Sequence, residues 1–231
     1  MKNASVYSRK FLTLLRRIGP AHQAQPPNKH DPVTQLVFGF LQWNAPRRGA
    51  EAAMQRIMRE MVDHNDLRVS HNHEITKLLG ESYPLAMERS ARMREALHEV
   101  FKREYIMSLD ALKDRSKRDV RAYLESLPGV TPFVAAHVTL VAFAGHAVPV
   151  DDRLATALRR EQAIDADATI IEITSFLEHQ IRANGALAAH AALQAWVDAG
   201  TRRVSLTRSA RTATTKKTAT RKSTKKKKKA G

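Results

Sequence analysis

The chain has 231 residues, of which 43% are hydrophobic and none is cysteine, and it carries a formal net charge of +16. Its length suffices for one or two domains with a buried core, whereas its longest apolar run, near position 140, is broken by His137 and His146 and is too short to cross a membrane. The lack of cysteine excludes disulfides, zinc–thiolate sites and cysteine-ligated iron–sulfur clusters, and it indicates a reducing compartment.

The first 30 residues contain no acidic residue, a feature shared with targeting peptides. Apolar residues nevertheless recur there at helical spacing, and Gly19-Pro20 ends the pattern. The residues concerned are Phe11, Leu14, Leu15 and Ile18. Because the apolar piece is too short for the core of a secretory signal, we expect an ordinary first helix.

The chain from residue 31 to residue 104 also favours helices. Asp31-Pro32 begins the segment VTQLVFGFLQW, which is apolar nearly all round and therefore predicts a buried helix. Two further stretches have apolar residues at helical spacing, the first with Ala53, Ile57, Met58, Met61 and Val62, the second with Leu97, Val100 and Phe101. No strand pattern and no internal repeat is found. The predicted fold class is all-α, a two-lobed helical bundle over residues 1–200.

A short turn joins two of the predicted helices. Ser116–Leu127 has an apolar face and ends at Pro128-Gly129, and Thr131 and Pro132 suit the N-cap and first position of an apolar helix. The backbone N–H groups at the start of a helix favour a phosphate oxygen. Many helix pairs turn at Pro-Gly, so the turn indicates a phosphate site only together with the sequence that follows it.

The next loop, His146–Val150, ends at the carboxylate of Asp151. Two interpretations of this residue stay open: a catalytic acid, or an N-cap of the following helix, for which Asp152 is equally suited. Further on, Thr169 and Glu172 resemble a capping box that begins a helix through about Arg182. Asn184-Gly185 predicts a turn, and Ala186–Val197 predicts a last helix.

With these elements in place, the sequence resembles the helix-hairpin-helix DNA glycosylase superfamily, whose best-known branch is endonuclease III. Leu127-Pro128-Gly129-Val130 resembles the start of the family's hairpin, and Val150-Asp151 resembles the pair that closes the loop after the next helix, at the family's separation without a gap. Asp31-Pro32-Val33 looks like the start of the family's first barrel helix. The resemblance covers about Ser8–Gly200, and its specific part is Leu124–Arg153.

The resemblance assigns roles toward DNA. It implies that Gly129, Val130 and Thr131 hold a backbone phosphate, and that Arg153, two residues beyond the acid, also lies at the DNA. Asn44 occupies the place of a polar residue that fills the gap left by a flipped base. Gln42 and Trp43 are alternative candidates for that gap, and Trp43 is otherwise a core aromatic.

The departures from the family limit the chemistry. Phe133 stands where bifunctional members carry the lysine that forms a Schiff base, and Thr131 replaces the second glycine of the turn. What remains implies a monofunctional DNA N-glycosylase of base excision repair, without a cofactor, in which Asp151 stabilises the positive charge on the sugar and orients or deprotonates a water. The alternative is a catalytically inactive, glycosylase-like protein that binds or compacts DNA.

The tail, residues 201–231, carries 13 of the 39 basic residues and none of the 23 acidic ones, which leaves residues 1–200 with a net charge of only +3. Such a composition predicts disorder and sequence-independent binding of polyanions. The tail ends in a run of basic residues, Lys225, Lys226, Lys227, Lys228 and Lys229. A solubilising role is the other interpretation. The expected partner is double-stranded DNA, with no membrane, and we expect a monomer in the cytoplasm, or the nucleus of a eukaryote, associated with DNA.

The histidines are interpreted as structural. His64, His71 and His73 invite a metal or nuclease site, but the nearby acids are scattered over a polar stretch, so no metal is expected. His137 and His146 flank the apolar helix, where hydrogen-bonded structural histidines are the more frequent case.

Overall fold

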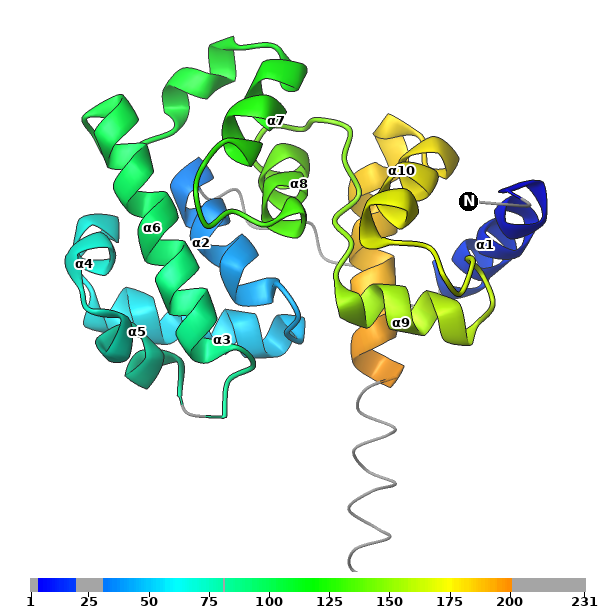
Figure 1. Ribbon diagram of the computed structural model, residues 1–231, viewed down its shortest axis with the longest axis horizontal. Coiled ribbons are helices and arrows are strands. Elements are labelled where there is room, and N and C mark those ends of the chain that lie inside the picture. Colours follow the sequence, from blue (N-terminus) through cyan, green and yellow to red (C-terminus); the bar gives the residue numbers. More distant parts are fainter. Residues whose placement is uncertain (1–3, 20–30, 81, 201–231) are drawn as a thin grey trace, which may run out of the picture.

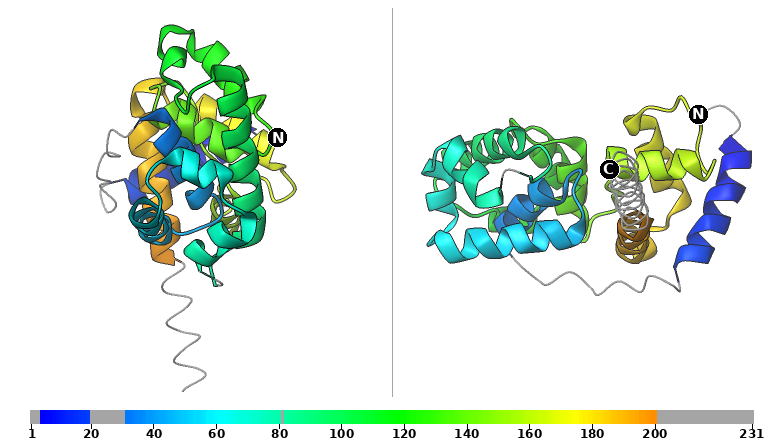
Figure 2. Two further views of the ribbon diagram at one scale, coloured as in Figure 1. Left: turned by 90° about the vertical axis from the view of Figure 1, so that its left-hand side faces the viewer. Right: turned by 90° about the horizontal axis from the view of Figure 1, so that it is seen from below.

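The computed structural model describes residues 4–19, 31–80 and 82–200, and within these ranges every regular element is a helix. The predicted basic tail, Lys225–Lys229 included, lies outside the described residues. The helices form two lobes side by side, which Figure 1 and the right-hand view of Figure 2 separate clearly. This arrangement confirms the expected all-α, two-lobed fold.

The first lobe is built from one continuous stretch of chain. Its elements are α2 (Pro32–Gln42), α3 (Arg47–Glu60), α4 (His64–Val69), α5 (Asn72–Leu79), α6 (Ala86–Glu104), the 3-10 helix η2 (Asp110–Asp114), α7 (Lys117–Glu125) and α8 (Pro132–Val141). The second lobe combines both ends of the described chain. Its elements are α1 (Ala4–Ile18), α9 (Asp152–Arg160), α10 (Ile170–Gln180), the 3-10 helix η3 (Ala183–Gly185) and helix 186–200.

Helix α8 belongs to both hydrophobic cores. Phe133, Val134 and Val138 pack in the core of the first lobe, whereas Ala136 and Leu140 pack in the core of the second. A helix covered from both sides must be apolar all round, and this is why the sequence of α8 has no polar face. In Figure 1, α8 accordingly lies at the inner edge of the first lobe, next to the second.

The predicted helix starts are confirmed. Thr131 caps α8 by accepting from the Val134 N–H, with Pro132 at the first helical position, and Thr169 and Glu172 form the capping box of α10. The Asp31 carboxylate caps α2 through the Val33 and Thr34 N–H groups. Helix α10 ends at Gln180, slightly before the predicted end at Arg182.

Two parts of the first lobe differ from the sequence expectation. The buried stripe of α3 runs through Ala50, Ala53, Met54 and Ile57, so Met58 faces solvent, and Val62 lies beyond the helix end at Glu60 with 94% of its surface exposed. The stretch around the histidines, interpreted as polar, forms α4 and α5. These short helices bury a few widely spaced side chains, Leu67, Ile75 and Leu79, which no continuous pattern marks.

The turn between α7 and α8 requires glycine at position 129. Gly129 has φ +78°, and a Cβ there would lie 2.4 Å from the carbonyl oxygen of Arg92 on α6. The backbone of the turn therefore packs directly on the backbone of α6, which leaves no room for a side chain.

The carbonyl end of α2 is held by the start of α6 and by the residues just before it. The fully buried guanidinium of Arg89 donates to the carbonyl oxygens of Phe40, Trp43 and Pro84, at 2.6 Å for Trp43 and 2.9 Å for Pro84. The Tyr83 hydroxyl donates to the Leu41 carbonyl at 2.7 Å. Helix α2 has no basic residue in its own last turn, so Arg89 supplies the positive charge that the C-terminal end of a helix favours. Burial lowers the Arg89 pKa to about 10, which leaves the side chain charged at neutral pH.

Replacing Arg89 should destabilise the whole first lobe. In Arg89→Met the carbonyl oxygens at the end of α2 stay buried without donors, and we expect a loss of about 3 kcal/mol or more in the free energy of unfolding. Urea denaturation measures this loss. The control is Lys102→Ala on the same helix, whose exposed ammonium pairs weakly with Glu99, and it should change stability by less than about 1 kcal/mol. Equal stability of Arg89→Met and the parent chain would contradict the assignment.

Candidate active site between the two lobes

Asp151 lies at the seam between the lobes, with only 2% of its surface exposed. One carboxylate oxygen caps α9 by accepting from the Leu154 N–H at 2.8 Å. The other accepts from the backbone N–H of Asn44, in the first lobe, at 3.2 Å. The N-cap interpretation is therefore confirmed, and it is compatible with a catalytic role because the same carboxylate also faces the opposite lobe.

Burial is the largest influence on the Asp151 carboxyl, and it raises the pKa above the ordinary value. The N–H groups of Leu154 and Asn44 and the charge of Arg153 act in the opposite direction and only partly offset burial. The net result is a carboxyl group whose pKa lies above that of an ordinary aspartate.

Asn44 joins the two lobes through both its backbone and its side chain. Its Nδ2 donates to Asp152 Oδ2 at 2.9 Å, and its Oδ1 accepts from the Asp152 N–H at 3.1 Å. The residue has φ +53°, a left-handed conformation that asparagine tolerates better than most residues. Of the three candidates for the base gap, Gln42 is buried and Trp43 packs against the core of the first lobe, whereas Asn44 forms hydrogen bonds across the seam.

A second clamp runs through Asp198 on helix 186–200. Its Oδ2 accepts from the backbone N–H of Arg47 at 2.9 Å, and its Oδ1 pairs with Nη2 of Arg153 at 2.5 Å. The guanidinium predicted to contact DNA is thus engaged with a carboxylate, and its side chain is only 17% exposed. No local pattern marks Asp198 or Arg47, because neither belongs to a motif.

The turn residues predicted to hold a phosphate lie elsewhere, against α6. Gly129 and Val130 are partly exposed, whereas Thr131 is buried and its hydroxyl serves the helix cap. The side chain that replaces the family's second turn glycine is therefore directed into the turn. The contact of this turn with phosphate stays a prediction.

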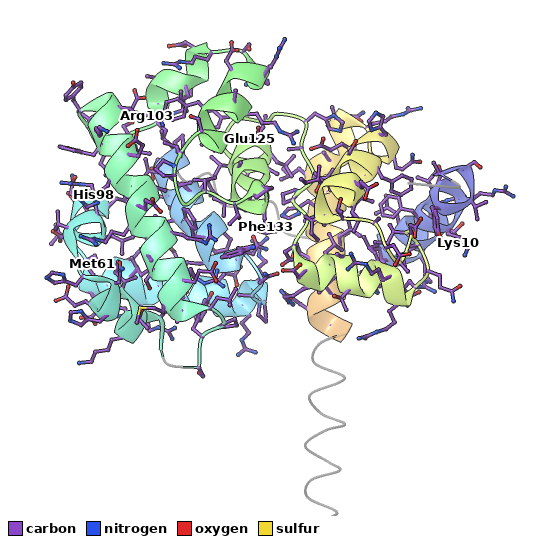
Figure 3. The ribbon with its side chains drawn as sticks, in the orientation of Figure 1. Lys10, Met61, His98, Arg103, Glu125 and Phe133 are labelled. Atoms are coloured by element: carbon purple, nitrogen blue, oxygen red, sulfur yellow. The ribbon has the colours of Figure 1, made fainter. Side chains whose placement is uncertain are left out.

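Phe133, in place of the lysine, belongs to an aromatic cluster at the boundary of the lobes (Figure 3). Its ring centroid lies 6.2 Å from that of His137 with nearly parallel planes, and 6.5 Å from that of His190 on helix 186–200. His137 also contacts Phe38 and His190, each with centroids 5.9 Å apart. His190 was not predicted, since a lone histidine in an alanine-rich helix gives no signal.

His137 and His190 are buried, and neither Nδ1 has a hydrogen-bond partner among the described residues. Burial is the main cause that lowers their pKa values, to about 3 for His137 and about 4 for His190, and the charge of Arg47 lowers both further. Both rings are therefore neutral at physiological pH. The expectation of hydrogen-bonded histidines holds for His146, whose Nε2 lies 2.8 Å from the Ile181 carbonyl, but is wrong for Nδ1 of His137.

The same two histidines line a cavity of about 240 Å³ between the lobes. Its walls come from α2, α3, α8 and helix 186–200, and they are largely apolar with a few converging polar groups. Small-molecule sites in proteins have this character. In residues 4–19, 31–80 and 82–200, no group of three potential ligand side chains suits a metal ion, and no helix there is long and apolar enough to span a membrane.

Solved structures share this fold. An endonuclease III trapped in a covalent complex with DNA superposes with a TM-score of 0.63 and 18% identity over 84% of this chain and 85% of that one. The 3-methyladenine DNA glycosylase of H. pylori, bound to 1,N6-ethenoadenine, gives 0.61 and 13% over 84% and 98%. A thermostable thymine-DNA glycosylase gives 0.54 and 19% over 85% and 86%. The chain therefore has the fold of the helix-hairpin-helix DNA glycosylases, which confirms the resemblance at the level of fold. No protein-family model and no curated protein sequence matches it.

The two buried histidines predict that the protein becomes less stable as the pH decreases. Because both folded-state pKa values lie below 6.5, the neutral forms contribute stability that is complete above pH 6.5 and lost as the pH falls toward 4 and 3. We expect the melting temperature to decrease between pH 7 and pH 5, and to decrease less in His190→Leu. His98→Gln, on the exposed side of α6, is the matched control and should follow the parent chain. A melting temperature that is constant over this range would refute the prediction.

Proposed function

We propose that this chain, which has the helix-hairpin-helix glycosylase fold, is a DNA-binding protein of base excision repair that acts as a monofunctional DNA N-glycosylase. One observation carries the proposal. The buried carboxylate of Asp151 is fixed at the lobe seam by N–H donors from both lobes, the Asn44 and Leu154 backbones.

The geometry supports a hydrolytic reaction. The target nucleotide is rotated out of the helix, at a cost of a few kcal/mol, so that the sugar comes to the seam. As the bond between C1′ and the base breaks, the base leaves with the electron pair and positive charge develops on the sugar. The Asp151 carboxylate stabilises that charge and takes a proton from the water whose oxygen bonds to C1′. Its raised pKa makes it a stronger base than an ordinary aspartate.

A lyase step is not part of the proposal. Covalent catalysis at the sugar needs an amine, and the side chain at position 133 is a buried phenyl ring packed on His137. The reaction therefore ends at the abasic site.

The remaining residues contribute DNA contacts. We assign binding of a backbone phosphate to the N–H groups of Gly129, Val130 and Thr131. We assign to Asn44 the filling of the gap that the flipped base leaves in the duplex, for which its side chain must release Asp152. Residues 1–200 form the glycosylase-like domain, in which Arg153 supplies a further contact to DNA. Residues 201–231 hold the protein on DNA through their positive charge.

The alternative is a DNA-binding protein without catalysis. It is favoured by the burial of Asp151, of which only 2% is exposed, and by Phe133 in place of an amine. It predicts DNA affinity independent of Asp151 and absence of base release.

The glycosylase proposal predicts that Asp151→Asn loses activity without unfolding. The asparagine oxygen can still cap α9, but its NH2 group cannot accept from the Asn44 N–H, so the melting temperature should fall modestly while the chain stays folded, whereas base release should fall by about a hundredfold or more. Duplexes with uracil, alkylated or oxidised bases, heated in alkali after incubation, report the release. On the duplex from which the base is released, kcat/KM should decrease at acid pH with an apparent pKa above the ordinary range of aspartate, as the raised pKa of Asp151 requires.

The control is Asp167→Asn, which removes a carboxylate on an exposed loop and should leave the rate as it is. Borohydride should trap no adduct with either protein, and a trapped adduct would show that another amine attacks the sugar. Equally low release by the parent chain and Asp151→Asn across the whole panel would instead establish the alternative.

Deletion of residues 201–231 tests the tail. Its 13 basic residues allow a log–log slope of affinity against salt concentration of up to roughly −12 at full engagement. We expect the truncated chain to bind DNA more weakly at low salt and with a flatter slope. An unchanged slope in fluorescence anisotropy titrations would remove the tail from DNA binding.

A further inference from the structure

Helix α1 presents a basic face to solvent. The exposed residues of this face recur at helical spacing, and they are Arg9, Lys10, Thr13, Arg16 and Arg17. The opposite face is apolar, and its residues Phe11, Leu14 and Ile18 are buried in the core of the second lobe. The helix is therefore fixed to the lobe by its apolar side, with its basic side left free for a partner.

The start of the chain accounts for the net positive charge of the helical body. Residues 1–18 contain five basic residues and no acidic one, whereas residues 19–200 contain 21 basic and 23 acidic residues. Arg17 pairs with Glu161 at 2.5 Å, but no carboxylate of the described residues pairs with Arg9, Lys10 or Arg16. Basic residues clustered on one helix face, without acidic partners, are typical of a surface that binds a polyanion.

A hollow of about 420 Å³ lies beside this face, between α1 and the chain that follows α9. Arg9, Lys10 and Thr13 line it from α1, and Glu161 lines it from the other side. The Glu161 carboxylate is compensated by Arg17, so the uncompensated charges at the hollow are those of Arg9 and Lys10. An anionic group placed there meets two cations that have no carboxylate of their own.

Helix α9 connects this hollow to the seam. The helix begins after Asp151 and ends at Arg160, directly before Glu161, and in Figure 1 it runs from the seam toward α1. Lys10, labelled in Figure 3, accordingly lies across the second lobe from Phe133. The nine residues of α9 span about 14 Å at a rise of about 1.5 Å per residue. A DNA strand advances about 3.4 Å per nucleotide, so this length corresponds to about four nucleotides.

Resting on the proposed function, we propose that the hollow at α1 binds backbone phosphates of the DNA flank, about four to six nucleotides from the target nucleotide. Arg9 and Lys10 make the contact. It is independent of base sequence, because it neutralises phosphate charge and reads no base edge. A membrane surface is the less favoured partner, since the apolar side chains that would enter it, Phe11, Leu14 and Ile18, are buried in protein.

The test measures binding by the full-length chain while DNA phosphates are neutralised one at a time. The duplex carries a tetrahydrofuran abasic analogue at its centre, and single methylphosphonates replace successive phosphates of both flanks. The variant is Arg9→Gln/Lys10→Gln, in which glutamine keeps the helix propensity of two exposed positions. The matched control is Arg59→Gln/Lys77→Gln, which removes the same charge from exposed positions on α3 and α5. Melting temperatures check that both variants are folded.

We expect the α1 variant to bind the unmodified duplex about fivefold to tenfold more weakly than the parent chain, and the control to stay within about twofold. The log–log slope of affinity against salt concentration should become flatter by about 2, since each neutralised phosphate contributes about 0.9. A methylphosphonate about four to six nucleotides from the analogue should weaken binding by the parent chain but not by the α1 variant, in which that contact is already absent.

Equal losses in the two variants, or methylphosphonate effects that are the same in the parent chain and the α1 variant at every position, would overturn the proposal. Unchanged DNA affinity together with weaker attachment of the α1 variant to phosphatidylserine vesicles would instead assign α1 to a membrane surface. Base release is measured separately, on the lesion panel. A chain that releases no base but shows the positional effect loses only the proposed activity. A chain that releases bases without the positional effect loses only the α1 site.

Discussion

The carboxylate of Asp151 is buried because both lobes supply it with hydrogen bonds. One donor comes from the start of α9 and the other from the Asn44 backbone, in the loop after α2. An uncompensated carboxylate at this depth would be costly, so the two donors and the position of the loop depend on each other. The loop in turn depends on Arg89 of α6, which donates to the carbonyl groups at the end of α2. The geometry of the seam thus depends on two buried charges, Arg89 and Asp151, each of which forms hydrogen bonds with backbone groups.

Helix α8 explains why the seam and the cavity occur together. Its residues pack into both cores, so the lobes share one rigid element instead of touching at two separate surfaces. Phe133 and His137, one turn apart on this helix, bring an aromatic ring and an imidazole to the same boundary. Gly39 on α2 permits this approach, because a Cβ there would lie 3.3 Å from the His137 ring. The seam at Asp151 and the cavity between the lobes therefore both depend on the packing of α2 against α8.

The net charge differs sharply between residues 1–200 and residues 201–231. Residues 1–200 are nearly neutral and many of their arginines are engaged within the protein, as Arg89 and Arg153 are. The net positive charge of the sequence is concentrated in residues 201–231.

Local sequence determined the features that depend on neighbouring residues. The caps at Asp31, Thr131 and Thr169, the turn at Gly129 and the all-round apolar character of α8 follow from side chains within a few positions of each other, so the helical fold and the position of Asp151 were predictable. The tertiary structure alone decided which distant groups meet. Asp198 pairs with Arg153 across 45 residues, Asn44 binds Asp151 across 107, and His190 reaches His137 from another lobe. No pattern along the chain records these pairs, because each joins residues that are distant in sequence and meet only where the two hydrophobic cores pack on α8.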